Sequence, residues 1–241
     1  DMGFSAMKFD PLPGHWRSYV DHEDLEHAAR VVGAVREAVG GRVELLIEIH
    51  RRLAPMNAIR LAKMIEQYRP YWFEEPNQSE NIPAIAEVKQ NTTIPVVTGE
   101  ALYTREEFRE VLERRAADIL NPDICNVGGI LEIVGIADMA APHLIAVSPH
   151  GNNSVAVGLG AAVNAAAVMP NFLIYEYFVN VQEISTDISV NPLLPEGGWI
   201  ELSDRPGIGV DLDETKMAKY PVEDYPPRNI RTVEDERQYN Q

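Results

Sequence analysis

Short apolar runs and amphipathic runs alternate along most of this chain, and this alternation limits the folds open to it more than any other feature. The apolar runs have the length of strands and begin at Ser5, Val43, Tyr71, Pro95, Ile119, Leu144 and Phe172. The runs between them have helical spacing and cover residues 22–39, 56–67, 82–89, 105–114, 129–141 and 154–168. Continuously apolar strands that alternate with helices are typical of a parallel sheet covered by helices. Seven strands in this rhythm favour a closed, TIM-like β/α barrel over an open sheet.

The rhythm stops after Tyr177, where prolines and glycines become frequent. We therefore predict a barrel domain over residues 1–177 and a C-terminal tail over residues 178–241. The tail stretch NPLLPEGGWIELSDRPGIGVDLDE has the composition of turns, and it predicts one or two short hairpin strands.

Composition argues against several classes of partner. The chain has 241 residues, of which 45% are hydrophobic and 24% are charged, as in an ordinary globular protein. Its net charge of −16 argues against nucleic acid, which binds to basic surfaces. No apolar run approaches the roughly 18 residues of a membrane span, so we expect no membrane partner. The single cysteine, Cys125, excludes an intramolecular disulfide and fits a reducing compartment, so we expect a cytoplasmic protein.

Polar residues follow the predicted strands at a regular interval. They are Lys8, Glu48, Glu74, Glu100, Asp123, His150 and Glu176. Both steps between the glutamates are 26 residues long, and the steps from Asp123 to His150 and on to Glu176 are 27 and 26. One βα unit has about this length, so we expect these residues at the same level of successive strands. In a β/α barrel that level is the carboxyl-end rim, where active sites lie.

The three glutamates in this series predict a metal site. Three carboxylates on adjacent strands would repel one another unless one took up a proton or a cation neutralised them. Glu48, Glu74 and Glu100 offer only oxygen ligands, which suit Mg²⁺, with Mn²⁺ as the alternative. Any one of them could instead cap a helix or pair with an arginine. Their common register favours the metal.

The next residues in the series predict acid–base chemistry. Asp123 and His150 follow neighbouring predicted strands, and a carboxylate beside an imidazole fixes its tautomer and raises its basicity. We interpret His150 as a general base, although a structural role in the SPHGNN turn is the alternative. Glu176 would donate a hydrogen bond to a substrate carboxylate or accept one, and Lys8 would help to hold that carboxylate.

Four segments carry a family resemblance: WFEEP (Trp72–Pro76), VVTGE (Val96–Glu100), NPDICNVGGI (Asn121–Ile130) and SPHGNN (Ser148–Asn153). In order and spacing they resemble the mandelate racemase/muconate lactonizing enzyme subgroup of the enolase superfamily, over essentially the whole chain. The resemblance implies a (β/α)₇β barrel with a separate α+β capping domain, built mainly from the N-terminus. It assigns the metal to Glu48, Glu74 and Glu100, the base dyad to His150 and Asp123, and an electrophilic acid to Glu176.

The first predicted strand lies in the stretch GFSAMKFDP, which resembles the family's second barrel strand. The chain is therefore expected to lack the first strand and the capping domain, and to be part of a longer protein. We expect the tail to pack on the barrel and on that missing domain.

Three positions refine the resemblance. The first metal ligand is usually aspartate in this family, and here it is Glu48. Racemases of the group carry Lys-x-Lys on the second strand, whereas here Asp10 follows Lys8 at that spacing. His50 lies two residues after Glu48 and is expected on the same face of its strand. In dehydratases of the galactonate type, a histidine at this place is the acid that protonates the departing 3-hydroxyl. The stretch EIHRRLAP also resembles mannonate dehydratases, but those lack the Pro122–Asp123 pair.

These features together predict Mg²⁺-dependent dehydration of an acid sugar to a 2-keto-3-deoxy acid, through proton abstraction next to the carboxylate and an enediolate intermediate. The alternatives are a racemase or epimerase of a hydroxy acid that uses the same intermediate, or a non-catalytic relative. We expect Arg17 to contact the substrate, with a solvated loop arginine as the alternative. We also expect a homo-oligomer.

Overall fold

The computed structural model describes residues 2–13, 20–152 and 155–221. Contacts divide this part of the chain into two compact units. The N-terminal unit contains Ser5–Thr98 and Glu113–Asp118, and the C-terminal unit contains Gly99–Leu112, the described residues from Ile119 onward and residues 2–4.

Four parallel strands form the sheet of the N-terminal unit. They are β1 (Ala6–Phe9), β2 (Glu44–Glu48), β3 (Trp72–Glu74) and β4 (Val96–Thr98), and each pairs with the next in chain order. The connections hold the helices α1 (His22–Val39), α2 (Pro55–Ile65) and α3 (Ile82–Gln90), together with the short 3₁₀ turns η1 (Gly40–Arg42) and η2 (Glu66–Tyr68). The predicted parallel, helix-covered sheet is thus confirmed in this unit.

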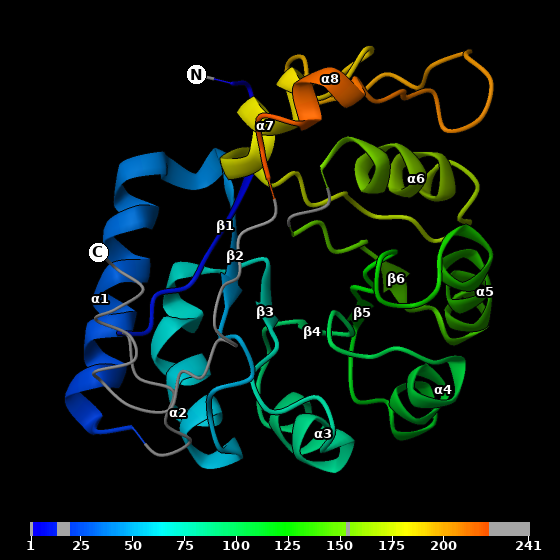
Figure 1. Ribbon diagram of the computed structural model, residues 1–241. Coiled ribbons are helices and arrows are strands. Elements are labelled where there is room, and N and C mark those ends of the chain that lie inside the picture. Colours follow the sequence, from blue (N-terminus) through cyan, green and yellow to red (C-terminus); the bar gives the residue numbers. More distant parts are fainter. Residues whose placement is uncertain (1, 14–19, 153–154, 222–241) are drawn as a thin grey trace. The chain divides into compact units, whose positions relative to one another are not determined.

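The core of the N-terminal unit lies between this sheet and its helices. Figure 1 shows α1 and α2 side by side next to β1 and β2. Leu25 of α1, Leu61 of α2 and Ile47 of β2 are fully buried in one apolar cluster. Because side chains alternate along a strand, Glu48 points to the face opposite Ile47 and away from the helices. The strands therefore present their polar ends on the face that the helices do not cover.

The C-terminal unit repeats the same strand–helix order. It contains α4 (Arg105–Arg114, whose last two residues belong to the other unit), β5 (Ile119–Leu120), α5 (Ile130–Ala140), η3 (Ala141–His143), β6 (Ala146–Val147) and α6 (Ala156–Ala166). β5 and β6 pair in parallel, and α5 packs against both β6 and α6.

The segment after α6 differs from its prediction as a strand over residues 172–175. It runs beside β6, where the Leu173 amide donates to the Val147 carbonyl at 2.8 Å, but among the described residues it forms only one parallel bridge, at Phe172. The ladder does not continue regularly beyond this bridge. Pro149, which follows β6, has no amide hydrogen to donate, and its carbonyl accepts from the Glu176 amide at 3.3 Å.

The tail combines short helices with the predicted turns. It contains η4 (Val179–Val181), α7 (Gln182–Asp187) and α8 (Glu214–Met217), which the sequence did not predict. The described part of the tail forms two isolated antiparallel bridges, Ser189 with Leu212 and Glu196 with Trp199, and none of the predicted hairpin strands. The boundary of the tail at residue 177 stays a prediction. Within the described ranges, no helix has both the length and the apolar character needed to cross a membrane.

Candidate functional site

Two of the predicted metal ligands lie side by side in the N-terminal unit. Glu48 ends β2, Glu74 ends β3, and the two residues are register partners. Both are buried. The Lys8 ammonium lies 3.1 Å from Glu48 Oε2 and 2.8 Å from Glu74 Oε1. The two carboxylates therefore converge on one positive charge, an arrangement that also suits a hard metal ion.

The two adjacent glutamates at the end of β3, Glu74 and Glu75, have different partners. Glu74 points toward Lys8 and accepts a hydrogen bond from the Trp72 indole at 2.8 Å. Glu75 accepts hydrogen bonds from the hydroxyls of Ser79, at 2.7 Å, and Thr98, at 2.8 Å. Glu75 is thus bound by hydroxyl groups inside its own unit, whereas Glu74 shares a cation with a second carboxylate.

His50 lies beside Glu48, although not through simple strand alternation. β2 ends at Glu48, and both His50 and Arg51 have left-handed backbone conformations, with φ of 51° and 62°. The turn brings His50 Nε2 to 3.5 Å from Glu48 Oε1. His50 Nδ1 is 2.6 Å from Oδ2 of Asp10, a residue for which the sequence analysis assigned no role at the site.

A second imidazole–carboxylate pair lies in the C-terminal unit. His150 Nδ1 is 2.7 Å from Asp123 Oδ2, as the predicted dyad requires. A carboxylate acceptor favours the tautomer with the proton on Nδ1. The other nitrogen, Nε2, then faces two carboxylates, with Glu100 Oε2 at 3.2 Å and Glu176 Oε2 at 3.7 Å. Four residues of the predicted site thus meet in this unit.

Glu100 is positioned by two residues that the sequence had not indicated, Asn121 and Gly99. The Glu100 amide donates to Asn121 Oδ1 at 3.2 Å. The preceding residue, Gly99, has φ of 142°, and a Cβ atom there would lie 2.8 Å from the Phe108 ring. Only glycine fits this close approach comfortably. The Gly–Glu pair in VVTGE is the sequence feature that could have indicated this role of Gly99.

Glu176 is held by the turn that follows β6. Its Oε2 accepts a hydrogen bond from the Gly151 amide at 3.2 Å. A Cβ atom on Gly151 would lie 2.2 Å from the Glu176 carbonyl oxygen and 2.8 Å from the Tyr175 hydroxyl. Burial, reinforced by the charges of Glu176 and Asp123, raises the pKa of Tyr175 above its usual value. The phenol is therefore neutral under ordinary conditions.

Arg17, expected to contact the substrate, lies outside the described residues.

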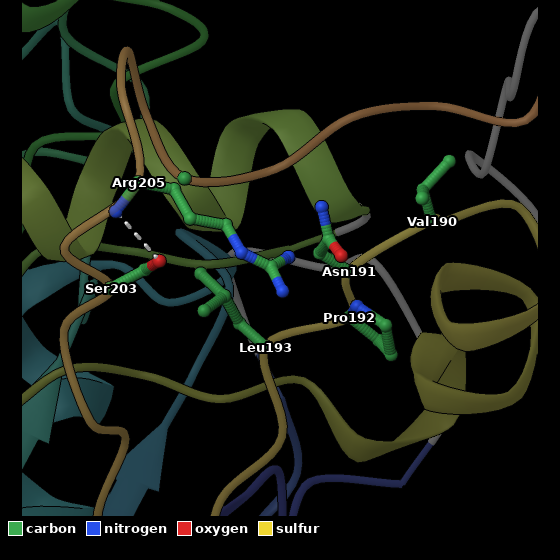
Figure 2. Close-up of a pocket in the computed structure, with 7 residues that line it drawn as sticks. Val190, Asn191, Pro192, Leu193, Ser203 and Arg205 are labelled. Atoms are coloured by element: carbon green, nitrogen blue, oxygen red, sulfur yellow. Dashed lines mark hydrogen bonds between the residues drawn. The ribbon is translucent and has the colours of Figure 1, made fainter.

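A separate open pocket of about 390 Å³ lies in the tail, and Figure 2 shows the Arg205 side chain extending across it. The residues that line this pocket include none of those predicted for the site.

Comparison with known proteins gives consistent matches. A family model described as "Enolase C-terminal domain-like" matches residues 1–216. The D-xylonate dehydratase of Haloferax volcanii is 34% identical over 229 residues, 92% of this chain and 55% of that protein. The D-gluconate dehydratase of Thermoproteus tenax is 33% identical over 222 residues, 92% of this chain and 44% of that protein. The chain thus spans about half the length of the curated relatives it matches.

A solved structure extends the match to three dimensions. A mandelate racemase/muconate lactonizing enzyme-like protein from Rubrobacter xylanophilus has a TM-score of 0.87 and 36% sequence identity. The match covers 93% of this chain and 59% of that one. This likeness confirms the predicted fold class, a TIM-like β/α barrel.

Proposed function

The chain belongs to the mandelate racemase/muconate lactonizing enzyme group of the enolase superfamily, and on that premise we propose that it carries the catalytic residues of an acid-sugar dehydratase. The proposed reaction removes water from a sugar acid and leaves a 2-keto-3-deoxy acid. The names of the xylonate and gluconate dehydratases among its relatives support this class. The observation that carries the proposal is the His150–Asp123 pair, because an imidazole held by a carboxylate is suited to remove a proton from carbon.

Members of this superfamily typically bind a divalent metal, and we propose that Glu48, Glu74 and Glu100 hold it here. Their donors are all carboxylate oxygens, which favours Mg²⁺, with Mn²⁺ as the alternative. The convergence of Glu48 and Glu74 on the Lys8 ammonium supports the fit to a cation. When bound, the ion would supply positive charge next to the substrate carboxylate and so favour loss of the neighbouring proton.

In the proposed first step, His150 Nε2 takes the proton from C2 of the sugar acid. Asp123 keeps the other ring nitrogen protonated and stabilises the imidazolium that forms. A proton next to a carboxylate is only weakly acidic, so the resulting enediolate needs nearby positive charge or hydrogen-bond donors. Lys8 supplies such a charge, and Glu176 in its acid form would donate a hydrogen bond to the substrate carboxylate. Arg17 is proposed to contact the distal part of the substrate.

In the proposed second step, His50 in its imidazolium form donates its Nε2 proton to the 3-hydroxyl as the C3–O bond breaks. The hydroxyl leaves as water, and the enol that remains tautomerises to the 2-keto-3-deoxy acid. The His50 side chain is 42% exposed, against 10% for His150, which suits a group that must reach a departing hydroxyl.

To test the proposal, exchange of the C2 proton and loss of water are measured separately in D₂O, with xylonate, gluconate and galactonate as substrates. We expect His150→Asn to lower both exchange at C2 and dehydration by about 10²–10⁴-fold, the usual contribution of a general base. His50→Gln should lower dehydration and leave exchange at C2 nearly unchanged. His143→Asn, at an exposed position, is the matched control.

Two results would overturn the proposal. If His150→Asn exchanges the C2 proton at the wild-type rate, His150 is not the base. Recovery of substrate inverted and labelled at C2, with no keto acid formed, would instead favour the racemase or epimerase alternative. If the wild-type protein neither exchanges nor dehydrates any of these acids and binds no divalent ion, the non-catalytic alternative holds.

A further inference from the structure

Asp10 follows β1 directly, and both of its carboxylate oxygens are engaged. Oδ1 accepts a hydrogen bond from the Leu12 amide at 2.9 Å, two residues further along the chain. Oδ2 lies 2.6 Å from His50 Nδ1. Since β1 and β2 are parallel neighbours, an aspartate at the exit of one strand meets a histidine at the exit of the next. The proposed function assigns Asp10 no role.

The C-terminal unit builds its Asp–His pair in the same way. Asp123 follows β5, and its Oδ1 accepts a hydrogen bond from the Cys125 amide, again two residues further on, at 2.7 Å. Its Oδ2 lies 2.7 Å from His150 Nδ1 at the exit of β6. In both pairs one oxygen is fixed by the local turn and the other faces Nδ1 of the imidazole. The repeated construction indicates the same physical effect on each ring.

Asp10 is also restrained by a buried arginine. Arg52 donates through Nη2 to Asp10 Oδ2 and through Nε to the Ile49 carbonyl at 3.1 Å. The Arg52 side chain is only 5% exposed, so its guanidinium has little freedom to move. Held by a backbone amide on one side and a guanidinium on the other, the Asp10 carboxylate presents a fixed acceptor to His50.

We propose that Asp10 is a positioning residue that fixes the ring orientation of His50 by accepting a hydrogen bond from its Nδ1–H group. The acid is then the imidazolium, which releases its Nε2 proton to the departing hydroxyl and keeps its Nδ1 proton on the side of Asp10. This inference rests on the proposed function, in which His50 is the acid. Racemases of this group carry a lysine at this position. Here Asp10 Oδ1 accepts the Leu12 amide and Oδ2 faces His50 and Arg52, so Asp10 does not supply a second base.

The first test needs no variant. In ¹⁵N-labelled wild-type protein, the ring-nitrogen correlations of the six histidines report which nitrogen carries the proton, and His50 is assigned by its loss in His50→Gln. We expect a proton on His50 Nδ1. A His50 ring with its proton on Nε2 alone would overturn the proposal, whether or not the protein dehydrates any acid sugar.

The second test uses Asp10→Asn. We expect kcat for dehydration to fall about 10–100-fold, as for other supporting carboxylates, with KM changed less than about twofold, exchange at C2 retained and the His50 tautomer pattern shifted. Asp10→Glu should restore part of the rate. The matched control is Asp118→Asn, because Asp118 accepts the Val96 amide and pairs with Lys89 but contacts none of the proposed site residues.

The outcomes separate the two proposals. If Asp10→Asn keeps both the wild-type kcat and the wild-type histidine spectrum, the positioning role is wrong. If exchange at C2 and dehydration fall together with the melting temperature, as in a general structural defect, it is also wrong. If the wild-type protein catalyses neither step, the proposed function fails, whereas the tautomer measurement still decides whether Asp10 orients His50.

Discussion

At the scale of single residues, the candidate site depends on backbone conformations that side-chain chemistry alone does not reveal. Gly99 places Glu100 through a conformation with φ of 142°, in contact with Phe108 and Asn121. His50 reaches Glu48 through a left-handed turn. Such conformations cost free energy in residues other than glycine and persist where surrounding contacts fix them. The residues of the candidate site are therefore positioned by the backbone conformation of their neighbours as much as by their own side chains.

We predict that Gly99→Ala lowers the free energy of unfolding by about 2–4 kcal/mol, because it adds an atomic overlap to backbone strain. The new Cβ would lie 2.8 Å from Phe108 Cε1 and 3.2 Å from the Asn121 nitrogen. Gly129→Ala is the control, since Gly129 has φ of 100° but no atom within 4 Å of its Cβ position. Urea unfolding measures both variants. Equal losses would show that strain alone, and not the close approach to Phe108, requires glycine at residue 99.

At the scale of elements, the strand–helix connections are fixed by specific side chains. Arg36, in the last turn of α1, donates to the carbonyls of Gly40 at 2.8 Å and Val43 at 2.7 Å. It also donates to the Tyr68 carbonyl at 2.9 Å and the Arg69 carbonyl at 3.1 Å. One planar guanidinium thus joins the end of α1 to the turn before β2 and to the turn after α2. A cation near the C-terminus of a helix also interacts favourably with its dipole.

Arg36→Lys should therefore destabilise the protein although it keeps the charge. A lysine ammonium cannot reproduce the fixed fork of donors, and each lost hydrogen bond contributes about 0.5–1.5 kcal/mol, so we expect a loss of about 2 kcal/mol or more. Arg30→Lys, on the same helix, is the control because Arg30 is exposed and its ion pair with Glu26 is long, at 3.8 Å. Arg30→Lys should alter the free energy of unfolding by no more than about 0.5 kcal/mol. Similar losses in the two variants on denaturant unfolding would contradict this account.

At the scale of the whole molecule, charge is the dominant property. The net charge of −16 favours the binding of cations, and three of the glutamates that contribute to it are the buried residues of the proposed metal site. Removing carboxylates from water is costly unless positive charge compensates for the loss. A divalent ion that binds the folded protein and not the unfolded chain stabilises the fold by mass action.

We predict that Mg²⁺ raises the melting temperature, with a gain of about 2.7 kcal/mol in the free energy of unfolding at 100 times Kd. Glu48→Gln and Glu74→Gln should each remove most of this gain at the same Mg²⁺ concentration. Glu44→Gln is the control, since Glu44 lies on the same strand as Glu48 but is exposed. Calorimetric melting with and without Mg²⁺ measures the effect. A Mg²⁺-induced shift of wild-type size in the Glu48 and Glu74 variants would rule out these glutamates as ligands.

The sequence by itself determined the order of the elements, the fold class and the family. The helices α1 and α4 begin and end at the predicted residues, and the predicted strands from β1 to β6 appear in order. These features follow from hydrophobic periodicity, which is local and repeats along the chain. The interval between strand ends also selected Glu48 and Glu74 as neighbours, because one βα unit advances the chain by one strand. For the same reason it selected Asp123 and His150.

Only the tertiary structure decided between residues that local pattern cannot separate. Glu74 and Glu75 are adjacent and chemically identical, yet one shares a cation with Glu48 and the other is bound by hydroxyl groups. The proposed role of Asp10 depends on a histidine 40 residues away. The predicted strand after β6 is interrupted beside Pro149, whose missing amide hydrogen matters only when the two segments lie side by side. Spacing along the chain fixes which residues reach the same level of a sheet. The direction and partner of each side chain depend on turn conformations and distant contacts, which form only when the chain packs.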